Sequence, residues 1–434
     1  MNGAMNLRAL GAAALALAAA VPVAAQPTVG EAGTFLIRGG TVVTVSGQTL
    51  PNASVLIQDG RIAAVGQNVT APAGTVTIDA TGKFVYPGLF DGYTPLGLSE
   101  IGGIATMNLR SEIGDYNPHN RAIVAINLDS EMLGVTRANG VTNVLTAPSS
   151  GIISGQAALI HTAGWTWEDI AVETTAAYVI NYPRVPSFQF GPAPEEAADR
   201  AARERVDEAI RDLKLTLTKA RDYERTRAAG APLSDQEYEA LRPLIRGEIP
   251  ALVSADEEEQ IRAVVALADT FDIDLIINGA GDAWKVADLL AQHDIPLVLG
   301  SIQSNPGSDE PYDAVFAAPG VLHRAGVKFA FSTGSGSGAR HVPYHAALAV
   351  AFGLPADAAL RALTLTAAEI FGVADRLGSI EQGKLANLFI ATGDPLDVRT
   401  QVTDVFIKGR RVPADDRHRR FYEKYNGRPK GGGD

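Results

Sequence analysis

Apolar strand-like runs alternate with helical stretches through the middle of this 434-residue chain. Alternation of this kind is typical of βαβ units, whose strands form a parallel sheet covered by helices. The runs predicted as strands are residues 84–90, 142–146, 251–254, 275–278, 296–299 and 328–332, and the predicted helices are residues 257–268, 284–293, 345–352 and 357–371. The pattern therefore predicts an α/β protein, although it does not by itself show that the sheet closes into a barrel.

Short strands broken by turn dipeptides occupy both ends of this α/β stretch. In residues 34–78, Asp59-Gly60 separates two apolar runs and predicts a tight hairpin, because this dipeptide tolerates the positive φ of a type I′ turn. Residues 386–391 and 402–407 are strand-like in the same way. Two β-rich blocks that bracket the α/β stretch predict one small sheet domain built from both ends of the chain.

The first 25 residues have the pattern of a cleaved export signal. Arg8 is followed by an Ala/Leu run, and Ala25 ends a stretch of small residues before Gln26. The alternative, a membrane anchor, is less favoured because the run is weakly apolar and at the lower limit of about 17–25 residues needed to span a bilayer. We therefore expect a periplasmic or secreted protein that is cleaved near Ala25 and has no membrane span.

Composition excludes several classes of function. The chain has no cysteine, which rules out a disulfide scaffold, a thiolate zinc site and a cysteine nucleophile. The 49 acidic residues exceed the 37 basic ones, giving a net charge of −12. Because binding to phosphates needs a basic surface, we expect no nucleic-acid partner.

Residues 192–249 are a segment dense in charges of both signs, and they predict an inserted pair of exposed helices with a break at residues 228–232. A solvated helical face explains such a segment, and a lid or a partner surface is the alternative. The charged and then glycine-rich residues 414–434 are expected to form a flexible tail.

Two motifs resemble the metal-dependent amidohydrolase superfamily, and in particular its exported imidazolonepropionase-like branch. They are Val85-Tyr-Pro-Gly-Leu-Phe-Asp91 and Gly378-Ser-Ile-Glu-Gln-Gly-Lys-Leu-Ala-Asn-Leu388. The resemblance implies a (β/α)8 TIM-like barrel plus a small β-sandwich domain made of N- and C-terminal strands. The implied division is a signal peptide (1–25), the barrel (87–376), the two parts of the sandwich (26–86 and 377–413) and the tail.

The family's metal ligands are missing at the positions that the resemblance assigns to them. Hydrolysis of an amide by this chemistry requires a metal that acidifies water and polarises the carbonyl. Tyr93 and Pro95 occupy the places of the family's first histidine pair, His161 the place of the mid-barrel lysine or acid, and Ser254, Gly279 and Gly334 those of two histidines and an aspartate. The resemblance therefore implies a barrel that has lost its metal centre.

Several polar residues remain as candidates for a rebuilt site. His161 and His119 are the candidate bases, with Glu100 and Asp129 to orient them, while Arg121, Gln156 and His341 are candidates for contact with a substrate. Loop residues of these kinds also form turns and helix caps, so that structural role stays open for them.

From these features we expect a non-catalytic ligand-binding protein or partner subunit with no cofactor. Its expected partners are a small amide-like or peptide-like ligand and a catalytically active homologous subunit. The alternative is an active hydrolase of non-peptide carbon–nitrogen bonds, with a rebuilt site or one weakly bound zinc, that acts on small amides, cyclic imides or dipeptide-like substrates.

Overall fold

The structure is a computed structural model that describes residues 30–100, 104, 107–185, 196–232, 234–306, 310–414 and 416–428. The predicted signal peptide and the start of the charged segment at residues 192–195 lie outside the described residues. Within this part of the chain, no helix is long and apolar enough to cross a membrane.

Eight strands form a nearly closed barrel, which confirms the predicted fold class. Their order in the sheet follows the sequence, from β6 to β13. They are β6 (Leu89–Thr94), β7 (Val141–Thr146), β8 (Ile153–His161), β9 (Ala171–Asn181), β10 (Ala251–Ala255), β11 (Leu275–Gly279), β12 (Leu297–Leu299) and β13 (Phe329–Phe331). The last strand packs back against the first, so that the α/β pattern closes on itself.

One strand departs from the all-parallel barrel that the resemblance implied. β8 pairs antiparallel with both β7 and β9, whereas every other neighbouring pair is parallel. The connection from β7 to β8 is correspondingly short, because antiparallel neighbours need no crossover helix. As a result, β8 begins at the end of the barrel where the other strands finish.

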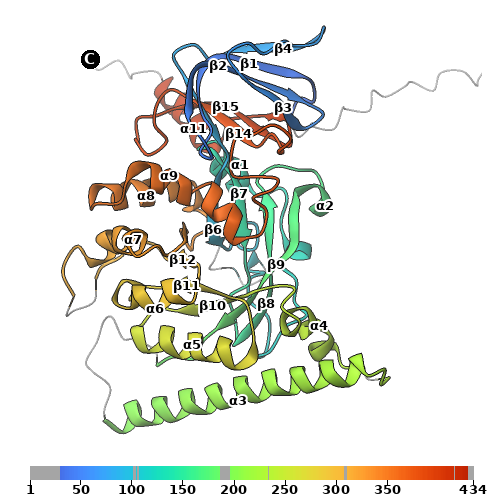
Figure 1. Ribbon diagram of the computed structural model, residues 1–434, viewed down its shortest axis with the longest axis vertical. Coiled ribbons are helices and arrows are strands. Elements are labelled where there is room, and N and C mark those ends of the chain that lie inside the picture. The colour runs from blue at the N-terminus through green and yellow to red at the C-terminus, as the bar shows by residue number, and fades with distance from the viewer. Residues whose placement is uncertain are drawn as a thin grey trace, which may run out of the picture.

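Helices cover the outside of the barrel (Figure 1). They are α1 (Glu131–Arg137), α2 (Trp167–Ile170), α5 (Glu258–Phe271), α6 (Ala287–Gln292), α7 (Ala314–Arg324), α8 (Val342–Ala351) and α9 (Ala356–Ala362), with short 3-10 turns η2 (Ala122–Ala125), η3 (Ala283–Val286) and η4 (Ala339–His341). A further helix, α10 (Leu365–Ile370), lies at one end of the barrel. The predicted helix 357–371 is thus divided into α9 and α10.

The barrel interior is filled by side chains from all eight strands. Phe90, Leu145 and Leu159 are representative members of this buried cluster, which also includes Ala367 and Ala368 of α10. The backbone N–H of Phe90 donates to the carbonyl of Leu363, just before α10. The helix therefore covers the end of the barrel where β6 begins, so the barrel interior can be reached only from the opposite end.

The terminal strands form a second sheet beside the barrel. Its members are β1 (Phe35–Val43), β2 (Thr49–Gln58), β3 (Arg61–Gly66), β4 (Val76–Asp79), β5 (Phe84–Pro87), β14 (Leu388–Ala391), β15 (Val402–Ile407) and β16 (Arg410–Val412). β5 joins the two halves by pairing with β1 on one side and β14 on the other. Figure 1 shows the blue N-terminal and red C-terminal strands side by side.

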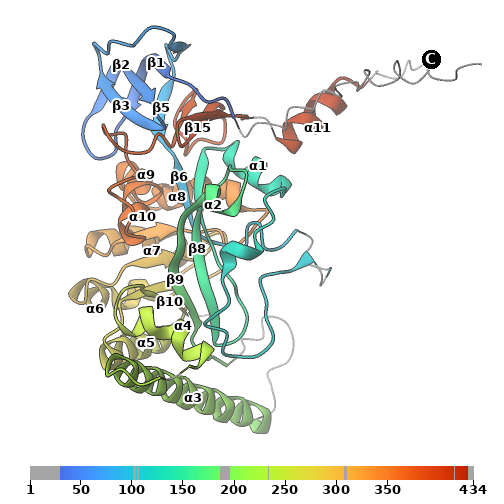
Figure 2. The ribbon, with the colours of Figure 1, turned by 90° about the vertical axis from the view of Figure 1, so that its right-hand side faces the viewer.

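The charged segment forms two helices, α3 (Glu196–Ala228) and α4 (Gln236–Ile245), on the far side of the barrel from the second sheet (Figure 2). Leu213 and Leu217 are fully buried in the main core. Helix α3 is therefore exposed on most of its surface but buried along one face. The sequence had predicted a pair of helices exposed on all sides. Last in the chain, α11 (Arg417–Asn426) lies near α1.

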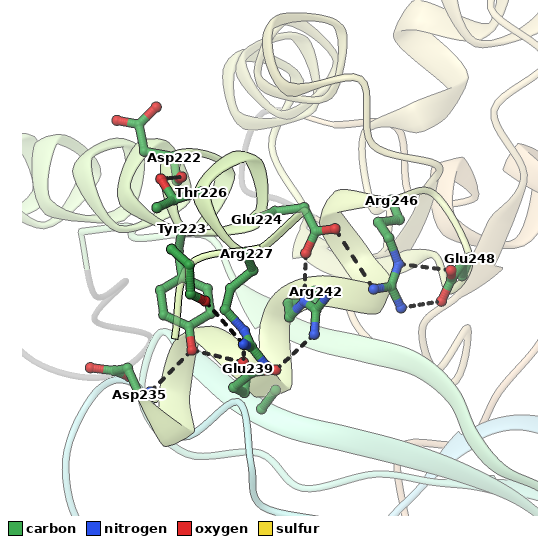
Figure 3. Close-up of polar contacts among 12 residues, drawn as sticks. Asp222, Tyr223, Glu224, Thr226, Arg227, Asp235, Glu239, Arg242, Arg246 and Glu248 are labelled. Atoms are coloured by element: carbon green, nitrogen blue, oxygen red, sulfur yellow. Dashed lines mark hydrogen bonds and ion pairs between the residues drawn. The ribbon is translucent and has the colours of Figure 1, made fainter. Parts of the chain in front are cut away.

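A network of charges holds α4 against α3 (Figure 3). Glu239 accepts hydrogen bonds from Tyr223 Oη at 2.8 Å, Arg227 Nε at 2.6 Å and Arg242 Nη1 at 3.0 Å. These donors, with the Tyr223 hydroxyl first among them, lower the pKa of Glu239 to about 2. Arg242 also donates to Glu224 at 2.6 Å, so one guanidinium bridges both helices.

We expect Glu239→Gln to loosen α4, because an amide cannot accept from three donors as a carboxylate does. Backbone amides of α4 should exchange hydrogen for deuterium faster than in the parent chain. Asp199→Asn is the matched control, because Asp199 accepts a single bond, from Arg203 on exposed α3, at 3.0 Å. Equal acceleration of α4 exchange in both variants would contradict the bridging role.

Candidate functional site

Neutral polar side chains stand in a row across the carboxyl ends of three strands. Asn181 of β9 lies beside Ser254 of β10, which lies beside Asn278 of β11. Asn278 Nδ2 donates to Ser254 Oγ at 3.2 Å, and Asn181 Nδ2 donates to Gly151 O at 2.8 Å and to Ser154 Oγ at 2.9 Å. Zinc binds imidazole, thiolate and carboxylate groups, so this row offers it no strong ligand.

Two further predicted ligand positions lie next to each other at the same end of the barrel. The backbone N–H of Gly334 donates to the carbonyl of Tyr93 at 3.1 Å. A Cβ added to Gly334 would meet no atom within 4 Å, so the space beside it is open. Burial raises the pKa of the Tyr93 phenol, which therefore stays neutral. Neither residue offers a charged ligand for a metal ion.

Asp91, in the first of the two motifs, is completely buried. Its carboxylate accepts from the backbone N–H groups of Thr333, at 3.0 Å, and Tyr93, at 3.3 Å, and from the Thr333 hydroxyl at 2.5 Å. Burial raises the pKa of Asp91 to about 7, and these hydrogen bonds oppose the shift. Asp91 therefore ties β6 to the end of β13, next to Gly334.

A carboxylate fills the space beside Gly279. A Cβ added to Gly279, whose φ is +90°, would overlap Oδ1 of Asp256. Asp256 also lies 3.5 Å from Arg184 Nη1, and both side chains are about half exposed. Burial raises the pKa of Asp256, while the Arg184 guanidinium opposes that rise. The site therefore has an acid and a cation where the resemblance implied a histidine.

Sequence reasoning did not select Asp256, Arg184 or Asn181. A signal for Asp256 was present, because it follows the predicted strand 251–254 and so stands at the carboxyl end of a barrel strand. Arg184 and Asn181 carried no such signal, because β9 was not predicted as a strand.

His161 lies at the opposite end of the barrel from the row of neutral residues, contrary to the prediction. The antiparallel course of β8 carries it to the side of Asn143, in the first half of β7. His161 Nδ1 is 3.1 Å from Asn143 Oδ1 and 3.0 Å from Asn387 Nδ2. Burial lowers its pKa to about 3, so this histidine is neutral and links the barrel to the second sheet.

The structure does not bring the other predicted residues together around His161. Glu100 accepts a hydrogen bond from Asn127 Nδ2, and the backbone N–H of Asp129 donates to Asn127 Oδ1. His119 and Arg121 are exposed. The amide of Gln156 is engaged at both ends, donating to Pro118 O and accepting from Thr175 Oγ1.

His341 makes a local contact and stands apart from the row of neutral residues. Its Nε2 lies 2.9 Å from Nε of the adjacent Arg340. The backbone carbonyl of Arg340 is fixed by Asn139 Nδ2, which lies before the start of β7. His341 is therefore placed on the outside of the barrel near that end of β7.

No group of three or more histidine, aspartate or glutamate side chains that could hold a metal occurs within the described ranges. Pro95 has no ligating side-chain atom. The described residues at the strand ends therefore fit poorly with the zinc centre that the resemblance implies.

Comparisons with known proteins agree with this architecture. Residues 311–412 match the model of the amidohydrolase family. An amidohydrolase from Thermotoga maritima MSB8 has a similar structure, with a TM-score of 0.78 and 25% identity, covering 87% of this chain and 99% of that one. The fold is thus that of an amidohydrolase-type barrel.

Curated relatives extend the likeness. Amidohydrolase tasK of Hapsidospora irregularis is 26% identical over 386 residues, which are 82% of this chain and 39% of the relative. D-hydantoinase of Geobacillus stearothermophilus is 44% identical over 73 residues, 17% of this chain and 15% of that enzyme. The chain thus spans about two fifths of the first relative and less of the second. The family model that matches residues 311–412 and the similar solved structure are thus both of the amidohydrolase type.

The crowding at Gly279 predicts a difference between two glycine substitutions. Gly279 and Gly334 both have positive φ, so alanine at either site costs about 1–2 kcal/mol of backbone strain. Only Gly279→Ala also meets Asp256, and we expect it to lower the free energy of unfolding by about 0.5–1.5 kcal/mol more, the cost of moving this half-exposed side chain off its rotamer. Chemical denaturation measures the free energy of unfolding of each variant. Adding Asp256→Ala to Gly279→Ala should recover part of the extra loss, and equal losses in the single variants would contradict the contact.

The pKa of His161 predicts how stability changes with pH. Between pH 6.5 and about 3 the unfolded chain binds a proton on this residue that the folded chain does not, so this contribution to stability falls as the pH falls. His161→Gln should reduce that dependence by up to about 1.4 kcal/mol per pH unit, as measured by urea unfolding from pH 6.5 to 4. Exposed His418→Gln is the control. A parallel pH profile for parent and His161→Gln chains would contradict the assignment.

Proposed function

We propose that this protein is an exported member of the superfamily that has lost the catalytic metal and serves as a ligand-binding or partner subunit. The observation that carries the proposal is the row of Asn181, Ser254 and Asn278. These side chains bond to neighbouring protein groups at the strand ends where the family's chemistry requires metal ligands. Gly334 and Pro95 have no side-chain atom that could bind a metal ion.

Two guanidinium groups near the mouth of the barrel favour a ligand with a carboxylate. Nε of Arg110 is buried and has no hydrogen-bond partner among the described residues, and its charge acts on Tyr93. Arg184 is half exposed beside Asp256. A carboxylate of the ligand would neutralise guanidinium charge at this place and form charge-assisted hydrogen bonds. Amide groups of the ligand would meet the hydroxyl and amide side chains of the row. This chemistry matches N-acyl amino acids and dipeptides.

A second candidate function is hydrolysis at a rebuilt site. It is favoured by Asp256, whose raised pKa and half-exposed carboxylate are properties of a general base. In this case hydrolysis would increase as the pH rises through the raised pKa of Asp256, and Asp256→Asn would abolish it. Such a site would use water directly or one weakly held zinc.

Metal content and ligand binding test the proposed function together. We expect protein purified without chelators to contain substoichiometric zinc and to gain no thermal stability from added zinc, because a ligand stabilises only the state that binds it. Titration calorimetry with N-acetyl amino acids and dipeptides should show binding that weakens about tenfold or more in Arg110→Gln or Arg184→Gln, because each variant removes a charge-assisted hydrogen bond.

Arg225→Gln, on exposed α3, is the matched control and should bind as the parent does. Arg121→Gln tests whether Arg121, which the sequence predicted to contact a substrate, contributes to ligand binding from its exposed loop. A stoichiometric complement of zinc together with turnover of these amides would overturn the non-catalytic proposal. Turnover without zinc that disappears in Asp256→Asn would establish the second candidate instead.

A further inference from the structure

Exposed aromatic side chains gather at one corner of the molecule. Seven Phe, Trp or Tyr side chains are strongly exposed in the part of the chain that the structure describes, and five of them lie on two elements. Trp165 and Trp167 belong to the turn that opens α2, and Phe421, Tyr422 and Tyr425 belong to α11. We call these two elements and the pocket between them the aromatic corner.

The turn that carries the two tryptophans is held in place by polar contacts. The backbone N–H of Trp165 donates to Asp169 Oδ2 at 3.0 Å, and Thr166 caps the N–H of Asp169. Lys408 Nζ lies 2.7 Å from Asp169 Oδ1 and ties the turn to the second sheet. The indoles are therefore presented from a fixed backbone, so binding to them requires little ordering.

The second element, α11, is a basic and aromatic helix without a buried residue. It has three arginines and a lysine against one glutamate. Its cations lie over its own rings, with Arg417 5.2 Å from the centre of Phe421 and Lys424 5.6 Å from that of Tyr425. Figure 2 shows the helix projecting from the body of the molecule near α1. Phe421, Tyr422 and Tyr425 are 42%, 71% and 63% exposed.

A pocket of about 650 Å³ lies between the two elements. Trp165 lines it from the turn, Arg420 from α11, and Asp129 and Glu131 from the start of α1. Arg420 contacts Glu131 at 3.2 Å, which fixes α11 beside the acidic rim. The corner thus combines aromatic groups with charges of both signs, and aromatic residues and arginine are enriched in protein interfaces.

We propose that the aromatic corner is the contact between two copies of this chain, related by a two-fold axis. In a two-fold dimer a patch meets itself, so it must carry both members of each complementary pair, as the basic α11 and the acidic rim of the pocket do. The chain as a whole has a net charge of −12. Two copies of this charge repel each other at long range, so the association rests on local pairing of the basic α11 of one copy with the acidic rim, Asp129 and Glu131, of the other, whereas an anionic membrane would repel that rim as well as the body.

Sedimentation equilibrium of the full chain tests this proposal. The parent chain should have twice the mass of one copy at micromolar concentrations. Replacing the α11 aromatics together (Phe421→Ser, Tyr422→Ser, Tyr425→Ser) should raise the dissociation constant at least tenfold. So should the charge reversal Arg417→Glu with Lys424→Glu. Circular dichroism checks that each variant is folded.

The matched control replaces three exposed apolar side chains elsewhere, at Leu215, Tyr312 and Val398, with serine, and should associate as the parent does. Dissociation of the control to the same extent, or a monomeric parent at every concentration, would overturn the proposal. Binding of the monomeric parent to phosphatidylglycerol vesicles, lost in the α11 variant, would assign the corner to a membrane instead. Neither result depends on ligand binding or zinc content, so this proposal and the proposed function fail separately.

Discussion

The cost of burying polar groups without partners governs both ends of this barrel. An unpaired polar group in the interior is destabilising by about 1–3 kcal/mol, so a barrel with polar residues at its strand ends is stable only if they are bonded. At one end, His161 contacts Asn143 and Asn387, and so joins β8, β7 and the residue before β14. At the other end, the row of Asn181, Ser254 and Asn278 bonds to itself and to the start of β8. Because β8 runs antiparallel to its neighbours, its first residues contribute to the hydrogen bonds at one end of the barrel and its last residue to those at the other.

The same constraint explains how the polar groups at the strand ends are satisfied by the protein's own hydrogen bonds. Clustered histidines and carboxylates would carry charges or compete for protons, and a metal normally holds such groups together. Neutral amides and hydroxyls need only hydrogen bonds, which neighbouring strands supply. Asp256 is the exception, and it remains partly exposed beside Arg184, where water and a guanidinium stabilise its charge. The residues that remain charged thus lie toward solvent, where a ligand can reach them.

Periodicity predicted the fold class, the two β-rich blocks and most of the parallel strands, because buried strands are recognisable as short apolar runs. It missed β8 and β9, whose runs carry Gln156, His161, Glu173 and Asn181 among their apolar residues. Without β8, the position of His161 followed only from an alignment to a parallel barrel, which is why it was placed at the wrong end. The residues at three of the family's ligand positions, Ser254, Gly279 and Gly334, could be identified from the sequence alone. The contact of Asp256 with Arg184 could not, because the two residues are distant in the sequence.

The pairing of β5 with β14 has a consequence for how the chain folds. The second sheet is continuous only when residues 84–87 lie beside residues 388–391, so its completion must wait for nearly the whole chain. Contacts between such distant segments are slow to form, because a long loop must close before they become favourable. A chain that emerges from its N-terminal end during synthesis therefore holds its first five strands, β1 to β5, before the final neighbour of β5, which is β14, has formed. Such a chain remains open to proteolysis and aggregation until its last strands arrive.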